Sequence, residues 1–132
     1  MADKISFDLV SPERLVLSDE AAMVTIPGSE GDMGVMAGHA PLISTLRPGI
    51  VAVAGGRTAE QRFFVAGGFA EVTPRKLTVL AEEAVPAAEL DAAALAARTA
   101  AAEAAVASAK TDAERAKAQE LLECLKQLKP VA

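Results

Sequence analysis

The chain has 132 residues, 52% of them apolar, and a formal net charge of −5, with one cysteine and one histidine. This length fits one domain of ordinary size, or a small domain with an appendage. An acidic chain without an Arg or Lys run argues against a nucleic-acid partner, and no apolar run reaches the ~20 residues that span a bilayer. One cysteine and one histidine exclude an internal disulfide and a Cys/His zinc site, so we expect neither metal nor cofactor.

Residues 1–85 alternate short apolar runs with turns that contain Gly or Pro, which is the pattern of an all-β domain. Apolar and polar residues alternate from Ile5, and Gly55-Gly56 suits a hairpin turn that needs positive φ. We expect strands at residues 5–9, 15–17, 22–26, 33–36, 42–46, 50–54, 61–66, 69–72 and 76–81. About eight to ten short strands at this spacing predict an N-terminal antiparallel β-sandwich.

The composition changes at Val85-Pro86, after which the chain has no Gly and is rich in Ala. We therefore predict a second domain over residues 86–132, a C-terminal antiparallel two-helix hairpin with helices at about 88–108 and 112–129. Thr111 and Glu114 have the spacing of a capping box at the start of the second helix. The second helix has an apolar stripe of Ala118, Leu121, Leu122, Leu125 and Leu128. The first offers a face of Ala94, Ala97, Ala101, Ala104 and Ala105. These small side chains bury little area, so we expect a weakly held hairpin.

The stretch from Gly28 to Leu42 carries the polar residues of greatest interest, because it combines tight turns with Glu30, Asp32 and His39. The two carboxylates have the composition of a general acid/base pair, and His39 with Asp32 and Ser29 has that of a catalytic triad. Nothing in the spacing supports the triad, and two such carboxylates are more often solvated turn residues. Turn residues that contact a partner explain the same pattern better, since shaped loops on a rigid scaffold often bind. We expect no catalytic residue.

Five stretches follow one another along the chain: Phe7-Asp8-Leu9-Val10-Ser11-Pro12, Gly28-Ser29-Glu30-Gly31-Asp32-Met33-Gly34, Gly38-His39-Ala40-Pro41-Leu42, Arg47-Pro48-Gly49 and Val79-Leu80-Ala81-Glu82. Together with the Ala-rich helix pair, they resemble the ε-subunit family of the F-type (rotary) ATP synthase over nearly the whole chain. In that family a ten-strand β-sandwich precedes a helical hairpin, which agrees with the fold expected from the residues.

The resemblance implies a non-catalytic subunit of the central stalk, or rotor, whose sandwich binds the γ subunit and rests on the ring of c subunits. The family residues that match Asp32 and His39 lie at this contact, and we expect Glu30 to take part beside them. Acidic side chains at this place can meet basic residues of the c-ring loops. The subunit would then transmit the rotation that couples proton translocation to ATP synthesis, without making or breaking a bond.

In bacterial relatives the helix pair also inhibits ATP hydrolysis by reaching the α/β catalytic head. The regulatory contacts implied here are Arg115, Lys117 and Lys126, but acidic residues interleave with them, so we expect weak inhibition at most.

Some relatives bind ATP through an Ile/Leu-Asp-x-x-Arg-Ala motif and arginines on the second helix. Leu90-Asp91 match the motif, whereas Ala94 and Leu95 replace its Arg and Ala. Glu123 and Gln127 stand where arginines would be needed, so we expect no tight ATP binding.

No apolar segment follows a basic start, so we expect no signal or import sequence. With the resemblance, this implies a bacterial protein bound peripherally at the cytoplasmic face of the inner membrane. The alternative is a stand-alone β-sandwich binding module with a helical appendage, which would have a concave apolar pocket and no affinity for γ.

Overall fold

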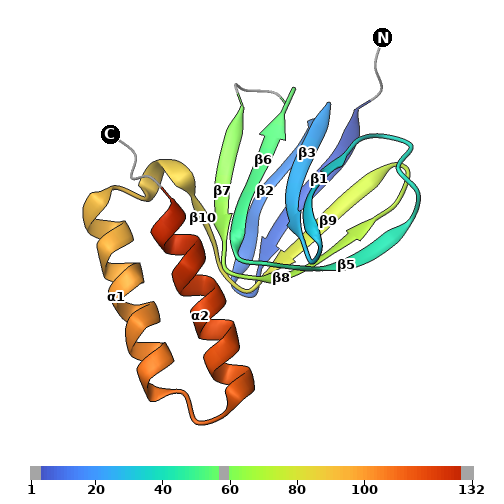
Figure 1. The fold of residues 1–132 in the computed structure, drawn as a ribbon. Helices are drawn as coiled ribbons and strands as arrows, with labels where there is room; N and C mark the ends of the chain where they lie inside the picture. The colour runs from blue at the N-terminus through green and yellow to red at the C-terminus, as the bar shows by residue number, and fades with distance from the viewer. Residues whose placement is uncertain (1–3, 57–59, 129–132) are drawn as a thin grey trace. The chain divides into compact units, whose positions relative to one another are not determined.

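The computed structural model describes residues 4–56 and 60–128. They fall into two compact units that divide between Pro86 and Ala87. The first unit is built from strands and the second from helices (Figure 1).

The first unit contains ten strands. They are β1 (Ile5–Ser11), β2 (Arg14–Ala21), β3 (Met23–Gly28), β4 (Gly31–Val35), β5 (Leu42–Leu46), β6 (Gly49–Ala54), β7 (Gln61–Val65), β8 (Gly68–Val72), β9 (Lys76–Ala81) and β10 (Ala84–Pro86). The last of them was not expected from the sequence. It was missed because its three residues adjoin the Pro86 that we took as the start of the helical region, although they pair with β7.

The strands form a sandwich of two layers. Hydrogen bonding runs in the order β10-β7-β6-β3-β5-β8-β9-β1-β2, and β4 pairs with β3 outside this path. One residue pair, Gly28 opposite Leu46, joins β3 to β5, and the sheet folds over at this junction. The layer of β10, β7, β6, β3 and β4 thus covers the layer of β5, β8, β9, β1 and β2 (Figure 1). The predicted antiparallel sandwich is confirmed, with β1 and β9 as a parallel pair inside it.

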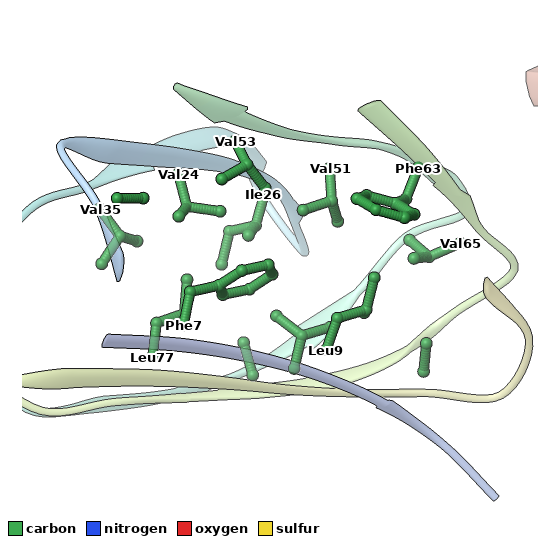
Figure 2. Close-up of a cluster of buried hydrophobic side chains, with 14 of the residues drawn as sticks. Phe7, Leu9, Val24, Ile26, Val35, Val51, Val53, Phe63, Val65 and Leu77 are labelled. Carbon is green, nitrogen blue, oxygen red and sulfur yellow. The ribbon is translucent and has the colours of Figure 1, made fainter. Parts of the chain in front are cut away.

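The hydrophobic core lies between the two layers. Phe7 and Leu9 of β1 and Leu77 of β9 point toward Val24 and Ile26 of β3 (Figure 2). All five side chains are fully buried. Successive residues of a strand point to opposite faces, so the alternation in the sequence directs one set inward and leaves the other set on the outer faces.

The second unit is a pair of helices, α1 (Ala92–Ser108) and α2 (Asp112–Gln127), which contact each other. The expected start of the first helix at residue 88 was wrong. A short 3-10 turn at Ala87–Glu89 comes first, and the Asp91 side chain accepts a hydrogen bond from the Ala94 amide at 2.8 Å, which caps α1. The second helix ends at Gln127, and Lys129 lies outside the described residues.

The start of α2 follows the prediction. The Thr111 hydroxyl accepts a hydrogen bond from the Glu114 amide at 3.1 Å, and the Glu114 carboxylate accepts one from the Lys110 amide at 3.1 Å. The first bond satisfies a backbone donor that the helix itself leaves unpaired, and the second satisfies the amide of the residue just before the cap.

The predicted alanine face of α1 was wrong. Four of the five alanines are exposed: Ala97, Ala101, Ala104 and Ala105. The covered stripe is instead Leu95, Thr99, Ala102 and Val106, at steps of four, three and four residues. On α2, Leu122 and Leu125 are buried as expected. Among the described helices, none is long and apolar enough to cross a membrane.

Candidate functional site

The turn between β3 and β4 forms an acidic tip at the edge of the sandwich. Ser29 and Glu30 are exposed in this turn, and Asp32 follows at the start of β4. Two glycines make the tight turn feasible. Gly31 has φ +145°, and a side chain on Gly28 would meet the Gly31 carbonyl oxygen at 2.9 Å. The tip therefore holds its two carboxylates on a short, sharply bent segment.

Arg47 connects this tip to the other layer of the sandwich. Its Nη2 donates to Asp32 Oδ1 at 3.0 Å, and its Nε donates to the Gly28 carbonyl at 2.7 Å. Its backbone amide also donates to the Pro27 carbonyl at 2.9 Å. The sequence singled out Arg47 only as part of the family stretch Arg47-Pro48-Gly49. The pair with Asp32 joins residues 15 positions apart, and the sequence carries no signal for it.

A groove of about 560 Å³ separates the tip from β5. Its walls are Gly28 to Met33 on one side and Leu42 to Thr45 on the other. Glu30 and Asp32 thus lie beside the exposed start of β5, where the Ile43 side chain is 70% exposed.

His39 lies at the other end of β4 from Asp32, in the segment between β4 and β5. Its Nδ1 is 2.8 Å from the Ala40 carbonyl, and its amide donates to the Met36 carbonyl at 3.1 Å. The Gly38 amide donates to the Pro74 carbonyl at 2.7 Å, which ties this segment to the turn between β8 and β9. Glu30 and Asp32 are therefore brought together, whereas His39 is held apart from them by the length of β4.

An apolar row crosses the outer face of the second layer. In register, Phe69 of β8 lies opposite Leu80 of β9, Leu80 lies opposite Val10 of β1, and Val10 lies opposite Leu15 of β2. Phe69, Leu80 and Leu15 are 45%, 38% and 56% exposed. Directly opposed side chains on one sheet face touch, so these four residues, here called the outer row, form one continuous strip. We did not predict it, because the strip depends on the strand register.

Polar residues lie beside the outer row on the same face. Asp8 of β1 pairs with Lys76 of β9 at 3.0 Å and accepts a hydrogen bond from the Ser18 hydroxyl of β2 at 2.8 Å. The Ser18 hydrogen bond, followed by the Lys76 contact, lowers the pKa of Asp8 below its ordinary value. This network leaves the carboxylate charged and fixed in place at neutral pH.

The predicted regulatory residues lie on α2. Arg115 pairs with Asp112 one turn before it, at 3.1 Å, and both side chains are exposed. Lys117 and Lys126 are exposed as well.

Asp91, which belongs to the partial ATP motif, has its carboxylate engaged in the cap of α1. Among residues 4–56 and 60–128, no three His, Cys, Asp or Glu side chains gather as a metal site would require.

The chain is similar to known proteins over nearly its whole length. The family model described as ATP synthase, Delta/Epsilon chain, beta-sandwich domain matches residues 4–87. The ATP synthase epsilon chain of Parvibaculum lavamentivorans is 60% identical over 129 residues, which are 98% of each chain. The epsilon chain of Paramagnetospirillum magneticum is 49% identical over 122 residues, 92% of each chain.

Solved structures show the same similarity. A chain in the Euglena gracilis mitochondrial ATP synthase structure, OSCP/F1/c-ring in rotational state 1, superposes with a TM-score of 0.73 at 30% identity. The match covers 93% of this chain and 78% of that one. A chain of the Tetrahymena thermophila mitochondrial ATP synthase central stalk and c-ring shares the fold, with a TM-score of 0.66 at 12% identity.

Proposed function

Because this chain belongs to the delta/epsilon chain family of the ATP synthase, we propose that it is a non-catalytic subunit of the central stalk that binds γ and the ring of c subunits. Turning with them as one body, it couples proton translocation to ATP synthesis. The chain contributes binding surfaces and stiffness, and no chemical step is assigned to any of its residues.

The observation that carries this proposal is the outer row. Phe69, Leu80 and Leu15 are exposed to water, with the half-buried Val10 between Leu80 and Leu15, and apolar strips of this kind mark surfaces that another protein covers. The strip lies across four hydrogen-bonded strands, which suits a long-lived contact that must carry torque. We assign it to γ, the subunit that forms the body of the stalk.

The acidic tip supports the contact with the c-ring. Glu30 and Asp32 stand on a stiff turn at one edge of the sandwich, where a basic loop residue of the ring can reach them. Charged contacts of this kind set register and specificity more than affinity. His39 is proposed for the same interface, from the other end of β4.

A reconstitution experiment tests the function directly. The full-length chain is mixed with an α, β and γ head stripped of its own ε subunit, and the mixture is separated by size. We expect stoichiometric co-elution that requires γ. Failure to co-elute at micromolar concentration would contradict the stalk assignment and favour the stand-alone binding module.

We also propose that the subunit sits peripherally at the cytoplasmic face of the bacterial inner membrane. The named relatives are bacterial epsilon chains, and no described helix is a candidate membrane span. Fractionation of the native cells tests this. The chain should remain with inner-membrane vesicles that carry the synthase and be removed from them together with the head and stalk.

The helix pair is proposed to have a weak regulatory role through the α/β head. Arg115 already pairs with Asp112, and the four acidic side chains of α2 outnumber its three basic ones, so the helix has no net positive charge. Replacing Arg115, Lys117 and Lys126 together by Gln should change ATP hydrolysis by the reconstituted head less than about twofold. A several-fold rise in hydrolysis would show strong inhibition instead.

A further inference from the structure

Glu71 of β8 is an exposed acid on the outer face of the second layer, directly beside the outer row. The residues before and after it are buried in the core, so its side chain points outward, on the same face as Phe69 two positions earlier. In register, Glu71 lies opposite Ile43 of β5 on one side and opposite Thr78 of β9 on the other.

Exposed apolar side chains surround Glu71. Ile43 is 70% exposed, Phe69 is 45% exposed, and Leu80, which lies diagonally opposite Glu71 on β9, is 38% exposed. Diagonal neighbours on one face of a sheet are still within reach of long side chains. A charged group among apolar side chains, rather than at their rim, is typical of an interface hot spot, where apolar contacts exclude water from a central polar pair.

The described part of the chain supplies no partner for this carboxylate. Within residues 4–56 and 60–128, no side chain forms an ion pair or a hydrogen bond with Glu71. Lys76, its other diagonal neighbour on β9, is paired with Asp8 at 3.0 Å, and Ser18 holds the second oxygen of Asp8. Of these two acids beside the outer row, only Glu71 therefore keeps an uncompensated charge.

A partner that covers the outer row also removes water from Glu71. Burial of a carboxylate without a partner is costly, whereas a basic side chain that reaches the carboxylate compensates its charge. A guanidinium group fits this place best, because it can bond the carboxylate through two N–H groups while its flat face lies on the Phe69 ring.

We infer that Glu71 is a specificity-determining residue of the γ contact: it receives a basic side chain of γ, best an arginine, among Ile43, Phe69 and Leu80. The inference rests on the proposed function, which assigns the outer row to γ. The outer row supplies apolar area along its whole length, whereas a single carboxylate accepts a cation at one place only. Glu71 would thereby fix the position of γ along the strip.

The test titrates the full-length chain, unmodified or changed at one position, into the α, β and γ head without the c-ring. Glu71→Gln removes the charge and keeps the shape of the side chain, and Glu71→Lys reverses the charge. Glu20→Gln is the matched control, because Glu20 is an exposed acid of the same layer whose neighbours on the outer face are Ser6 and Ser18. Denaturant unfolding of each free chain should show that Glu71→Gln is as stable as the unmodified chain.

We expect Glu71→Gln to weaken binding to the head at least about tenfold, mainly through faster dissociation, and Glu71→Lys to weaken it further. Glu20→Gln should stay within about twofold of the unmodified chain. Changing one basic residue of γ to Glu should restore the binding of Glu71→Lys. Ile43→Ser opens the site to water, so the additional loss caused by Glu71→Gln should be smaller in that background.

Two results would overturn the inference. If Glu71→Gln bound the head as tightly as Glu20→Gln, Glu71 would lie outside the contact. If no charge reversal at an exposed basic residue of γ restored the binding of Glu71→Lys, γ would not supply the cation. An unmodified chain that does not bind the head would instead contradict the proposed function, and the partner named here would fall with it.

Discussion

Lys76 Nζ lies 3.0 Å from Asp8 Oδ2 across the only parallel strand pair found in the described part of the sandwich, that of β1 and β9. Ser18 holds the other oxygen of Asp8 from β2, so three neighbouring strands meet at one carboxylate. The hydrogen bond from Ser18, and then the contact with Lys76, lower the pKa of Asp8, while partial burial opposes them. The network ties β1 to both of its neighbours, β2 and β9.

The first prediction concerns stability at acidic pH. Because the pKa of Asp8 is lowered in the folded state, its contribution is fully present above the ordinary Asp pKa of about 4 and is lost as the pH falls below it. Asp8→Asn should cost about 1 kcal/mol at pH 7 and should flatten the loss of stability in acid. Denaturant unfolding at several pH values measures both effects. Glu71→Gln, an exposed acid on the same face, serves as the control, and an unchanged acid profile in Asp8→Asn would contradict the prediction.

The second prediction concerns the turn before β8. Gly68 has φ +131°, and a side chain there would collide with the Leu80 carbonyl and come within 2.9 Å of Ala81 Cα. Gly68→Ala should therefore lower the free energy of unfolding by about 3 kcal/mol. Gly38 also has positive φ, at +88°, but nothing lies within 4 Å of its added carbon. Gly38→Ala should cost only about 1 kcal/mol, because it introduces backbone strain without a collision. The difference between the melting temperatures of the two variants therefore measures the cost of the collision at Gly68. Equal losses would show that the contact with β9 is unimportant.

The third prediction concerns the caps of the helix pair. Asp91→Ala and Thr111→Ala each remove a side-chain acceptor for the backbone of a first helical turn, and each should destabilise its helix by about 1 kcal/mol. Amide exchange resolved to α1 and α2 measures this without requiring the sandwich to unfold. Ser108→Ala at the end of α1 is a control that removes a hydroxyl from a position that does not cap. Protection unchanged in both cap variants would argue that packing alone holds the pair.

The fourth prediction concerns the outer row. Phe69 and Leu80 are 45% and 38% exposed, so Phe69→Ser and Leu80→Ser should each lower the stability of the free chain by about 1 to 2 kcal/mol and leave it folded. Binding to γ should nevertheless weaken at least about tenfold for the double variant, because a buried aromatic and its neighbour dominate such contacts. Titration of the α, β and γ head measures the affinity. Met36→Ser, at a side chain 56% exposed outside the row, should bind normally. Full affinity in the double variant would show that γ binds another face of the sandwich.

Local signals in the sequence predicted those features of the fold that depend on residues close together in the chain. The period-2 alternation around Phe7 and Leu9 placed the core side of β1, and the spacing of Thr111 and Glu114 predicted the cap of α2. The alanine face of α1 failed for a physical reason. Where nearly every position is Ala, the sequence has little contrast between faces, and the few larger residues such as Leu95 decide which side packs.

The proposed binding surfaces were less predictable, because they depend on contacts between residues distant in sequence. Glu30 and Asp32 look equivalent until Arg47 is brought beside only one of them. The outer row needs the register of four strands, including the parallel match of Val10 with Leu80, which no local pattern specifies. His39 matched the family pattern, but its distance from the acidic tip became apparent only when β4 was placed between them.

Because β1 pairs with β9, one of its two partner strands is made late during synthesis of the chain on the ribosome. The first strand to emerge has β2 as its only early neighbour, and its other edge stays open until Lys76 to Ala81 have been made. An open, apolar strand edge invites pairing with other nascent chains. A transcript or a deletion that stops short of β9 should therefore give an insoluble product, whereas one that stops after Pro86 leaves every strand of the sandwich with its partners.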